Sequence, residues 1–569
     1  MATPQDTVLQ AVEELQTQGL FLSAHDRAMT AIADGLDGDR LRHLAVLTLA
    51  RAGATLSALG LLRQLRLVGS DDPEIAGLYP RLLKDIALDS GSVIDAAAAG
   101  AAYTALWERH GDGWYGVNAA AMALLAGDPG RARDLAAAVR ALADSQDYWS
   151  AATQGEAAFL LGDTDAAGRW LARAEARAGR DLSCRATTHR QLGWEAGLLG
   201  VDAAPADLLV IPDTIHFCGL IPGAPADEAQ LRAQLEQLLR PVGFAFGGLA
   251  AGADIVVVEM LLALGALVTV VLPFPPEVYL DQSVIQAGAA WVPRYRACLE
   301  RVTVQVLETV QNDDLDYGLA SRRAMGLACL HARRLESRSW QLAIWDGGGS
   351  AGPAGTAADV AAWRGMGGRT HIIESPWPRR RGAAPAGAVP QRTAKAVLFG
   401  DLPRFSELDD AALLAFYTGP LVAMGRVVDE TAPLYRNAWG DAVQLVFDDP
   451  ATAALCAFRL RATASAGQLT AAGLPATLVP RLAMDFGGLY PVFDPVQQAT
   501  KFAGRVMTRA ARIEPVTPPG SIYATEAFAC EAALMANAPI ACDYAGRVPL
   551  AKSFGTLPLY AVHPKRHAR

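Results

Sequence analysis

Apolar residues recur at helical spacing from the N-terminus to about Asp202. Segments such as QDTVLQAVEELQ and NAAAMALLAGDPGRARDLAAAVRAL place Ala, Leu and Val three and four residues apart, which is the pattern of amphipathic helices. Glycines that can close a helix recur every 34 to 38 residues, at Gly19, Gly53, Gly91, Gly127, Gly162 and Gly200. This period predicts stacked helical hairpins over residues 1–204.

The clearest repeats, ALLAGDPGRARDLAAAV and AFLLGDTDAAGRWLARA, each read as a helix, a Gly-Asp turn and a second helix with small residues on its packing face. They resemble tetratricopeptide repeats (TPR). The resemblance implies a solenoid whose concave face binds a protein partner. An irregular α-helical domain is the alternative interpretation.

The pattern changes at about residue 205, where apolar runs rich in β-forming residues (DLLVIP, ALVTVVLPF, WQLAIWD) alternate with helical stretches. That alternation predicts an α/β domain with a parallel sheet over residues 205–374. Two glycine-rich segments follow its strands and could cradle a phosphate on backbone N–H groups, although turns built for packing explain them about as well. The candidate nucleotide-binding residues are Gly247, Gly248, Gly252, Asp254, Glu259, Asp346, Gly347, Gly352, Gly355 and Thr356.

GPAGTAADV, residues 352–360, resembles the PGGxGTxxE signature found in the SLOG superfamily of Rossmann-like nucleotide-binding domains. Asp359 or Val360 stands at the position of the signature's glutamate. We therefore expect this domain to sense a nucleotide. Cleavage of a nucleotide by this domain is a further alternative.

Residues 375–392, SPWPRRRGAAPAGAVPQR, have the composition of an extended linker. Beyond it, the strand AKAVLFGD ends at Asp401, and YRNAWGDAVQLVFDD reads as a hairpin with Asp441 at its tip. Two carboxylates at the ends of adjacent strands can hold two hard divalent cations such as Mg²⁺ or Mn²⁺. A later segment, KFAGRVMTRAARIE, reads as a helix that ends in Arg512.

Together these segments resemble the class III adenylate/guanylate cyclase catalytic domain, an α+β fold of ferredoxin-like type. VLFGDLPRFSEL is similar to the family's first metal motif, WGDAVQLVF to the second, and FAGRVMTRAARIE to the GxxVNxAxR helix. The resemblance covers residues 393–569. It implies that Asp401 and Asp441 bind the metals, and that Arg512 stabilises the transition state.

The resemblance also implies an NTP substrate, two Mg²⁺ or Mn²⁺ ions per site, and a homodimer in which the chains share each site. Four further positions correspond to family residues but carry other types or surroundings. Thr508 replaces the ribose-binding asparagine, Asn437 and Lys501 occupy the base-selecting positions, and Lys552 stands near the phosphate-binding lysine. These substitutions leave the base unassigned and keep alternatives open: a catalytically silent nucleotide sensor or scaffold, or a pyrimidine-nucleotide cyclase in a stress or phage-defence pathway.

Composition narrows the function classes. The chain is 51% hydrophobic and carries a formal net charge of −9, which disfavours a nucleic-acid partner. Seven scattered cysteines form no metal or disulfide pattern and fit a cytoplasmic protein. The longest apolar run, residues 260–274, is too short to span a bilayer, so no membrane span is expected. Because all three cyclase-like motifs and a β-rich segment follow the linker, we expect a fragment starting near Thr393 to fold by itself and to show some cyclase activity.

Overall fold

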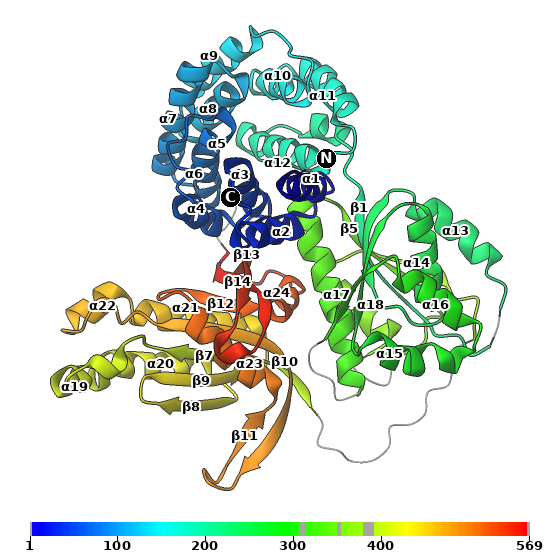
Figure 1. Ribbon diagram of the computed structural model, residues 1–569, viewed down its shortest axis with the longest axis vertical. Helices are drawn as coiled ribbons and strands as arrows, with labels where there is room; N and C mark the ends of the chain where they lie inside the picture. The colour runs from blue at the N-terminus through cyan, green and yellow to red at the C-terminus, as the bar shows by residue number, and fades with distance from the viewer. Residues whose placement is uncertain (1–2, 225, 308–312, 350–353, 379–391, 566–569) are drawn as a thin grey trace.

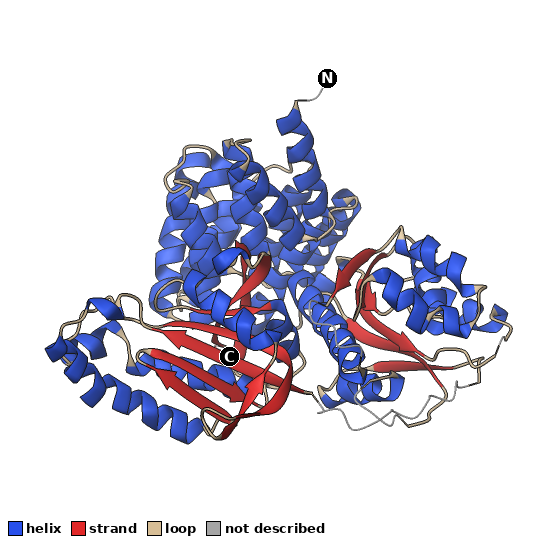
Figure 2. Ribbon diagram, turned by 60° about the horizontal axis from the view of Figure 1, so that its bottom comes forward, coloured by secondary structure: helices blue, strands red, loops and turns tan. Residues whose placement is uncertain are grey.

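The computed structural model describes residues 3–224, 226–307, 313–349, 354–378 and 392–565. Within them the chain forms helical repeats, then an α/β domain with an all-parallel sheet, then an α+β domain with a mixed sheet (Figures 1 and 2). We call these the repeat domain, the central domain and the C-terminal domain. The fold class expected from the sequence is confirmed for all three.

The repeat domain consists of paired helices. They are α1 (Pro4–Thr17), α2 (Phe21–Ala33), α3 (Asp39–Arg51), α4 (Thr55–Gln64), α5 (Pro73–Ala76), α6 (Leu78–Ser90), α7 (Val93–His110), α8 (Gly113–Leu125), α9 (Pro129–Arg140), α10 (Tyr148–Leu160), α11 (Thr164–Ala178), α12 (Leu182–Leu199) and the 3₁₀ turn η1 (Ala204–Leu208). The six periodic glycines follow α1, α3, α6, α8, α10 and α12, and each has a positive φ. A left-handed residue after a helix is the conformation that favours glycine, so the period marks the end of every inner helix.

The row of inner helices curls until its last member, α12, lies beside its first, α1 (Figure 1). Arg51 on α3 fastens this closure, because its Nη1 donates a hydrogen bond of 2.8 Å to Ser183 Oγ on α12. The repeats therefore surround a central space instead of opening as an extended concave face.

The central domain contains a six-stranded parallel sheet in the order β4-β3-β2-β1-β5-β6. Its strands are β1 (Asp213–Gly219), β2 (Val242–Gly247), β3 (Leu267–Leu272), β4 (Thr303–Val306), β5 (Ser339–Trp345) and β6 (Thr370–Glu374). Its helices are α13 (Ala229–Leu239), α14 (Ala253–Ala263), α15 (Pro276–Ser283), η2 (Ile285–Ala287), α16 (Trp291–Leu299), α17 (Asp314–Leu335) and α18 (Thr356–Gly365). Helices α13 to α16 pack on one face, and α17 with α18 on the other.

The C-terminal domain has a mixed sheet in the order β13-β14-β12-β10-β7-β9-β8, and β11 pairs with the far end of β10. The strands are β7 (Thr393–Asp401), β8 (Tyr435–Trp439), β9 (Ala442–Phe447), β10 (Arg481–Asp494), β11 (Ala499–Ala503), β12 (Ile522–Thr525), β13 (Ile540–Pro549) and β14 (Thr556–Pro564). The helices are η3 (Phe405–Glu407), α19 (Asp410–Thr418), α20 (Pro420–Thr431), α21 (Pro450–Thr463), α22 (Ala466–Ala471), α23 (Arg505–Ile513), η4 (Glu514–Val516), α24 (Glu526–Ala533) and η5 (Ala551–Ser553). Residues of α20, α21 and α24 pack on one face of the sheet, and α23 packs on the other.

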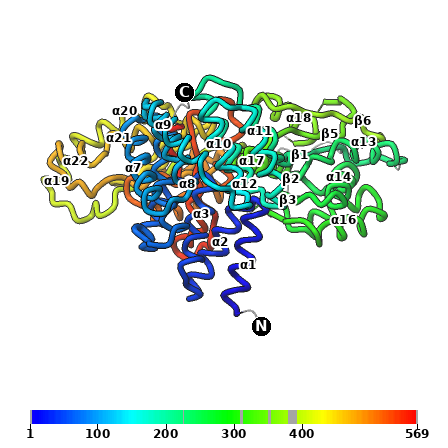
Figure 3. Tube along the Cα trace, turned by 90° about the horizontal axis from the view of Figure 1, so that it is seen from above, coloured from blue at the N-terminus to red at the C-terminus, as the bar shows by residue number. Residues whose placement is uncertain are grey.

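Helix α17 connects all three domains, and Figure 1 shows it between the central sheet and the rest of the molecule. Its Arg322 forms a bidentate ion pair with Glu531 of α24, with distances of 2.8 and 2.5 Å. At its other end, Glu336 accepts a hydrogen bond of 2.7 Å from Arg190 of α12. The repeat domain also contacts the C-terminal domain directly, since Tyr544 Oη donates to Asp26 of α2 at 2.7 Å. Seen from above, the repeat domain therefore lies over the junction of the other two (Figure 3).

The last residue of the predicted linker, Arg392, is held inside the protein. Residues 379–391, including Arg379, Arg380 and Arg381, lie outside the described residues, but Arg392 is buried. Its guanidinium donates to Asp313 at 2.6 Å and to Asp316 at 2.7 Å, at the start of α17. Strand β7 is thus anchored to α17 at its first turn.

One helical run among the described residues, Asp410–Thr431, is long and apolar enough to cross a membrane by length and composition. In the structure Gly419 separates it into α19 and α20, and Pro420 begins the second helix. The buried residues of α20, Met424 and Val427 among them, pack into the core beside α21. One side of α20 is therefore part of the core of the C-terminal domain, whereas Leu414, Tyr417 and Val422 of the same run are exposed.

Candidate active site

Asp401 and Asp441 meet at one edge of the C-terminal sheet. Asp401 is the last residue of β7, and Asp441 follows Gly440 in the tight turn between β8 and β9. Gly440 has a φ of +63°, a conformation that favours glycine in such a turn. The two carboxyl groups lie close enough to shift each other's pKa, and the backbone N–H of Leu402 donates to Asp441 Oδ2 at 3.2 Å. The structure thus brings together the two carboxylates that the sequence singles out.

The same face of the sheet carries helix α23 and Arg512. Alternation along the strands places Val397, Phe399 and Asp401 of β7 on one face, and Val397 and Phe399 pack with residues of α23. Arg512 lies in the last turn of α23 and is half-buried. Its side chain has no ion-pair partner within the described ranges. It is therefore available to an anion on the face that bears both aspartates.

The carboxyl groups of this site influence one another. Burial, together with the neighbouring charge of Asp401, raises the pKa of Asp441 to about 7. Burial alone would raise the pKa of Asp401, but its interaction with Asp441 and the guanidinium of Arg481 outweigh this and hold it below its ordinary value. Two carboxyl groups this close share negative charge that a cation would relieve.

Sequence reasoning missed Arg481 and Glu514. Arg481 pairs with Asp401 in the antiparallel register of β10 and β7, and its Nη2 lies 2.6 Å from Asp401 Oδ2. Glu514 follows α23, and its Oε1 lies 2.8 Å from Arg481 Nε. Burial and the charge of Asp401 raise the pKa of Glu514 to about 7. The available signal was an arginine at the start of a strand, but the register that places it opposite Asp401 cannot be read from the sequence.

The donor set of Asp401 and Asp441 suits a hard divalent cation. Among the described residues no group of three or more His, Cys, Asp or Glu side chains is arranged to hold a metal ion. Two carboxylates nevertheless fit Mg²⁺, because this ion usually keeps several waters and takes further oxygen ligands from substrate phosphates. Arg481 supplies the positive charge beside Asp401 in the structure, so a cation there would share this carboxylate with the arginine.

The residues expected to hold the nucleotide's base and ribose are on three elements. Asn437 lies on β8, paired with Gln444, on the same face as Asp401. Lys501 lies on β11, and its Nζ donates to Asp494 Oδ2 at 2.6 Å. The hydrogen bond to Asp494 raises the pKa of Lys501, and the phenol of Tyr435 on β8 contributes to the shift.

Thr508 is exposed on α23, next to Arg509, which is buried and holds Asp485 with bonds of 2.5 and 2.8 Å. Lys552 is exposed in η5. Both side chains can reach a ligand only if it lies against the outer side of α23 or its neighbouring loop.

In the central domain, the predicted nucleotide-binding residues gather at the carboxyl ends of the parallel strands. Gly247 ends β2, and Gly248 and Gly252 lie in the loop that leads into α14. Asp346 and Gly347 follow β5, and Gly355 and Thr356 begin α18, whereas Gly352 lies outside the described residues. Strands β2 and β5 flank β1 on either side, so this is the edge where ligands bind open α/β sheets.

Asp254 is buried in the first turn of α14, beside this edge. Its Oδ2 accepts a hydrogen bond of 3.1 Å from the backbone N–H of Ala250, and its Oδ1 is buried without a hydrogen-bond partner among the described residues. Burial, with a contribution from Asp359, raises the pKa of Asp254 to about 7. The structure leaves the nucleotide-binding role of this loop as a prediction.

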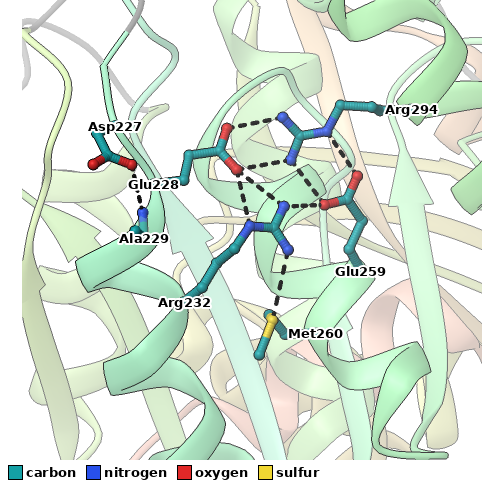
Figure 4. A network of polar contacts seen from close by, with 7 residues as sticks. All are labelled: Asp227, Glu228, Ala229, Arg232, Glu259, Met260 and Arg294. Atoms are coloured by element: carbon teal, nitrogen blue, oxygen red, sulfur yellow. Dashed lines mark hydrogen bonds and ion pairs between the residues drawn. The ribbon is translucent and has the colours of Figure 1, made fainter.

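Glu259 has a different environment, shown in Figure 4. Its carboxylate accepts hydrogen bonds of 2.7 and 2.8 Å from Arg294 of α16 and also pairs with Arg232 of α13. Glu228 bridges the same two arginines. Glu259 thus joins three helices in a closed ion-pair network beyond the first turn of α14.

Comparisons with known proteins agree with this architecture. Residues 10–123 match the family model described as TPR-S, Tetratricopeptide Repeats-Sensor, which confirms the expected tetratricopeptide-like repeats. A comparison with curated proteins finds no match.

Solved structures similar to this chain include three cyclases. The adenylyl cyclase CyaB from P. aeruginosa is 20% identical with a TM-score of 0.27, and the match covers 32% of this chain and 98% of that one. The guanylyl cyclase Cya2 is 16% identical with a TM-score of 0.27 over 31% and 94% of the two chains. The guanylate cyclase domain of RhGC from Catenaria anguillulae, in complex with GTP, is 15% identical with a TM-score of 0.25 over 30% and 97%. Each match covers about a third of this chain.

Proposed function

We propose that the C-terminal domain is a class III nucleotidyl cyclase that converts an NTP, ATP or GTP in the first instance, to a 3′,5′-cyclic nucleotide and pyrophosphate. The observation that carries the proposal is the meeting of Asp401 and Asp441 on the face of the sheet that also bears Arg512. The three motifs that resemble the cyclase family are far apart in the sequence, and the fold gathers them.

In this reaction the ribose 3′-oxygen attacks the α-phosphorus, the bond to the pyrophosphate oxygen breaks, and the hydroxyl proton is lost. Asp401 and Asp441 would hold the divalent cations, which when bound lower the pKa of the hydroxyl and neutralise phosphate charge. Arg512 would donate to the α-phosphoryl oxygens as charge builds there, an electrostatic contribution typically worth about 3 kcal/mol. Arg481 would keep Asp401 ionised and oriented, since it contacts that carboxylate directly.

We further propose that the active form is a homodimer with shared sites. Large apolar side chains are exposed at both ends of the sheet. Trp439, beside the candidate site at the end of β8, is 86% exposed, and Phe493 and Val496, at the opposite end of β10, are 62% and 89% exposed. Exposed apolar groups of this size favour contact with another protein surface. A second copy would cover them and bring its own Arg512 to the carboxylates.

The activity is tested by incubating the full chain with each of the four NTPs and Mn²⁺ and separating the products by chromatography. A cyclic product that falls about 100-fold or more in Asp401→Ala and in Asp441→Ala supports the proposal, because each change removes an oxygen ligand. Asp410→Ala is the matched control, since Asp410 is an exposed carboxylate at the start of α19. Activity within about threefold of the parent chain in either site variant would contradict the metal assignment.

The shared site is tested by mixing two inactive variants. Asp401→Ala and Arg512→Ala proteins, once they have exchanged subunits, should form heterodimers with one intact site and recover part of the activity. A mixture that exchanges subunits, as shown by differently tagged chains, and yet stays inactive would contradict a site shared between chains.

A catalytically silent nucleotide sensor is the second candidate. It is favoured by Arg481, whose guanidinium already neutralises Asp401 at 2.6 Å, and by Thr508 at the ribose position. This candidate predicts that an NTP binds and is recovered unchanged.

We propose for the central domain the SLOG-like role of binding a nucleotide at the carboxyl edge of its sheet, and for the whole chain a cytoplasmic location. Both proposals rest on the sequence features given above. Release of a free base from an NTP would instead favour the hydrolase alternative for this domain.

A further inference from the structure

The repeat domain encloses a large cavity. It measures about 880 Å³ and lies among the inner helices α1, α3, α6, α8 and α10, with residues at the start of α12 completing the wall. Binding sites for small molecules commonly measure about 300 to 1,000 Å³. A smaller cavity of about 50 Å³ adjoins it and shares Arg81, Trp114, Trp149, Thr153 and Thr187. The closure of α12 against α1 makes this a chamber of ligand size.

Two arginines line the chamber, and neither has a carboxylate within hydrogen-bond distance of its guanidinium group. Arg51 is 7% exposed, and the one hydrogen bond found for its guanidinium within the described ranges goes to the neutral hydroxyl of Ser183. Arg81 is 9% exposed, and the nearest carboxylate oxygen, on Asp85, lies 4.0 Å from its Nε. The Nε atoms of both arginines are buried without a hydrogen-bond partner among the described residues. Burial of a cation without a paired anion is costly, so both side chains would gain from an anionic ligand.

The pKa of Arg51 reflects its burial without a closely paired anion. Burial lowers its pKa to about 10, and the positive charge of Arg81 adds to the effect. The two guanidinium groups therefore lie close enough to repel each other. One anion between them would relieve both the repulsion and the burial cost.

Five carboxylates also line the chamber, and the charge of Asp181 partly offsets that of Arg51. Asp112, Asp147 and Asp181 accept hydrogen bonds from the first backbone N–H groups of α8, α10 and α12. Glu13 and Glu74 both pair with Arg40 near the mouth of the chamber. The positive charges of Arg51 and Arg81 lie on the inner wall formed by α3 and α6.

Aromatic side chains form the opposite wall. Trp114 and Trp149 line both cavities, and Trp149 remains 36% exposed although it lies inside the curl of the repeats. An indole kept open to a cavity offers a flat apolar surface to a planar ring. The hydroxyl group of Thr153, which lines both cavities, can bond the edge of such a ring.

We propose that this chamber binds a small phosphorylated molecule with a planar ring, a nucleotide in its chemical class, with the phosphate on Arg51 and Arg81 and the ring against Trp114 and Trp149. The site is separate from the carboxylate site of the C-terminal domain, and the inference does not depend on cyclase activity. It assigns to the repeats a small-molecule ligand, where the sequence led us to expect a protein partner.

The chamber has a direct connection to the rest of the molecule. Arg190 on α12 lines the smaller cavity, donates to Glu336 at 2.7 Å and donates to the backbone oxygen of Arg334 at 2.9 Å. A ligand that draws α12 toward Arg51 and Arg81 would therefore act on the C-terminal end of α17.

Binding is tested by calorimetry on the full chain, in EDTA to prevent metal-dependent binding at the C-terminal site. The probes are the four nucleoside 5′-monophosphates, the four triphosphates and inorganic pyrophosphate. At least one nucleotide should bind with a dissociation constant of about 1 mM or tighter. Arg51→Gln and Arg81→Gln should each weaken it about tenfold or more, which corresponds to about 1.4 kcal/mol, while Arg63→Gln on the exposed side of α4 should not change it.

Trp149→Ala separates a loss of binding from a loss of folding. The Trp149 side chain is partly exposed, so its removal leaves no buried cavity and should not unfold the domain. All variants should keep the helical circular dichroism and melting temperature of the parent chain. Failure of every nucleotide to bind at about 5 mM, or binding that persists unchanged in Arg51→Gln, Arg81→Gln and Trp149→Ala, would overturn the proposal. Pyrophosphate that binds as tightly as any nucleotide would refute the part of it that concerns the ring.

Discussion

Replacement of Gly326 by alanine should loosen the contact between the central and C-terminal domains. Gly326 lies in the middle of α17, where a Cβ atom would lie 2.5 Å from the Cα atom and the carbonyl oxygen of Cys530 on α24. Ordinary contacts between carbon atoms are about 3.5 to 4.0 Å. Since the clash is with backbone and not with a flexible side chain, α17 and α24 must move apart by about 1 Å.

The cost follows from opposing contributions. Overpacking of a close contact costs about 1 to 3 kcal/mol. The same separation stretches the bidentate pair between Arg322 and Glu531, and a hydrogen bond to a charged group contributes about 1.5 to 3 kcal/mol. Alanine gains about 1 kcal/mol over glycine through its helix propensity. The net loss in the free energy of docking is about 1.5 to 5 kcal/mol, so the opened state should become at least about tenfold more populated.

Hydrogen exchange followed by mass spectrometry measures this opening directly. Amides of α24 should exchange about tenfold faster or more in Gly326→Ala, while those of the central strand β7 stay protected. Gly425→Ala is the matched control, because Gly425 is also inside a helix and an added Cβ there meets nothing within 4 Å. If α24 exchanges at the same rate in both variants and in the parent chain, the close packing of α17 on α24 is not what holds the domains together.

Three further predictions concern other contacts. Asp26→Asn should raise the melting temperature at pH 8 but not at pH 4. Burial raises the pKa of Asp26 to about 6, so above that pH its carboxylate destabilises the folded chain by up to about 3 kcal/mol, whereas below the unfolded pKa near 4 this destabilisation is absent. The amide oxygen of the variant can still accept a hydrogen bond from Tyr544. Arg392→Gln should destabilise the chain by about 3 to 5 kcal/mol in chemical denaturation, since it removes a cation that is bonded to the fully buried Asp316 and to Asp313. Trp439→Ser should weaken self-association in sedimentation experiments without lowering the melting temperature, because the side chain is 86% exposed in the single chain; an unchanged association constant would exclude this surface from the dimer.

The sequence was sufficient for the repeats because their signal is local. Each periodic glycine, such as Gly53 or Gly127, terminates a helix within a few residues of itself and has the positive φ that its position requires. The closing of the solenoid was not predictable in this way. It depends on the contact of Arg51 with Ser183, 132 residues later, and no local pattern encodes that pairing.

The candidate site was predictable in part for the same reason. A strand that ends in Asp401 and a Gly-Asp turn at Asp441 are local features, and the fold brings the two side chains together. Arg481 and Glu514 belong to the same cluster through strand register and through the end of α23. Register is set by long-range packing of whole strands, so a single sequence does not reveal which residue lies opposite Asp401.

The linker led to an expectation that the contacts oppose. Its composition indicates that a fragment beginning near Thr393 folds by itself, yet one hydrophobic core runs from the repeats through α17 into the C-terminal domain. Such a fragment lacks residues that bury Ala529 and Cys530 on α24 and Leu534 directly after it. Tyr544 and Tyr560 belong to the same buried cluster. The fragment would expose this apolar surface to water and leave Glu531 without Arg322. Helix α17 therefore joins the repeats to the C-terminal domain by side-chain contacts that bypass the linker, and we expect a change in how α17 packs on α24 to be felt in the C-terminal domain.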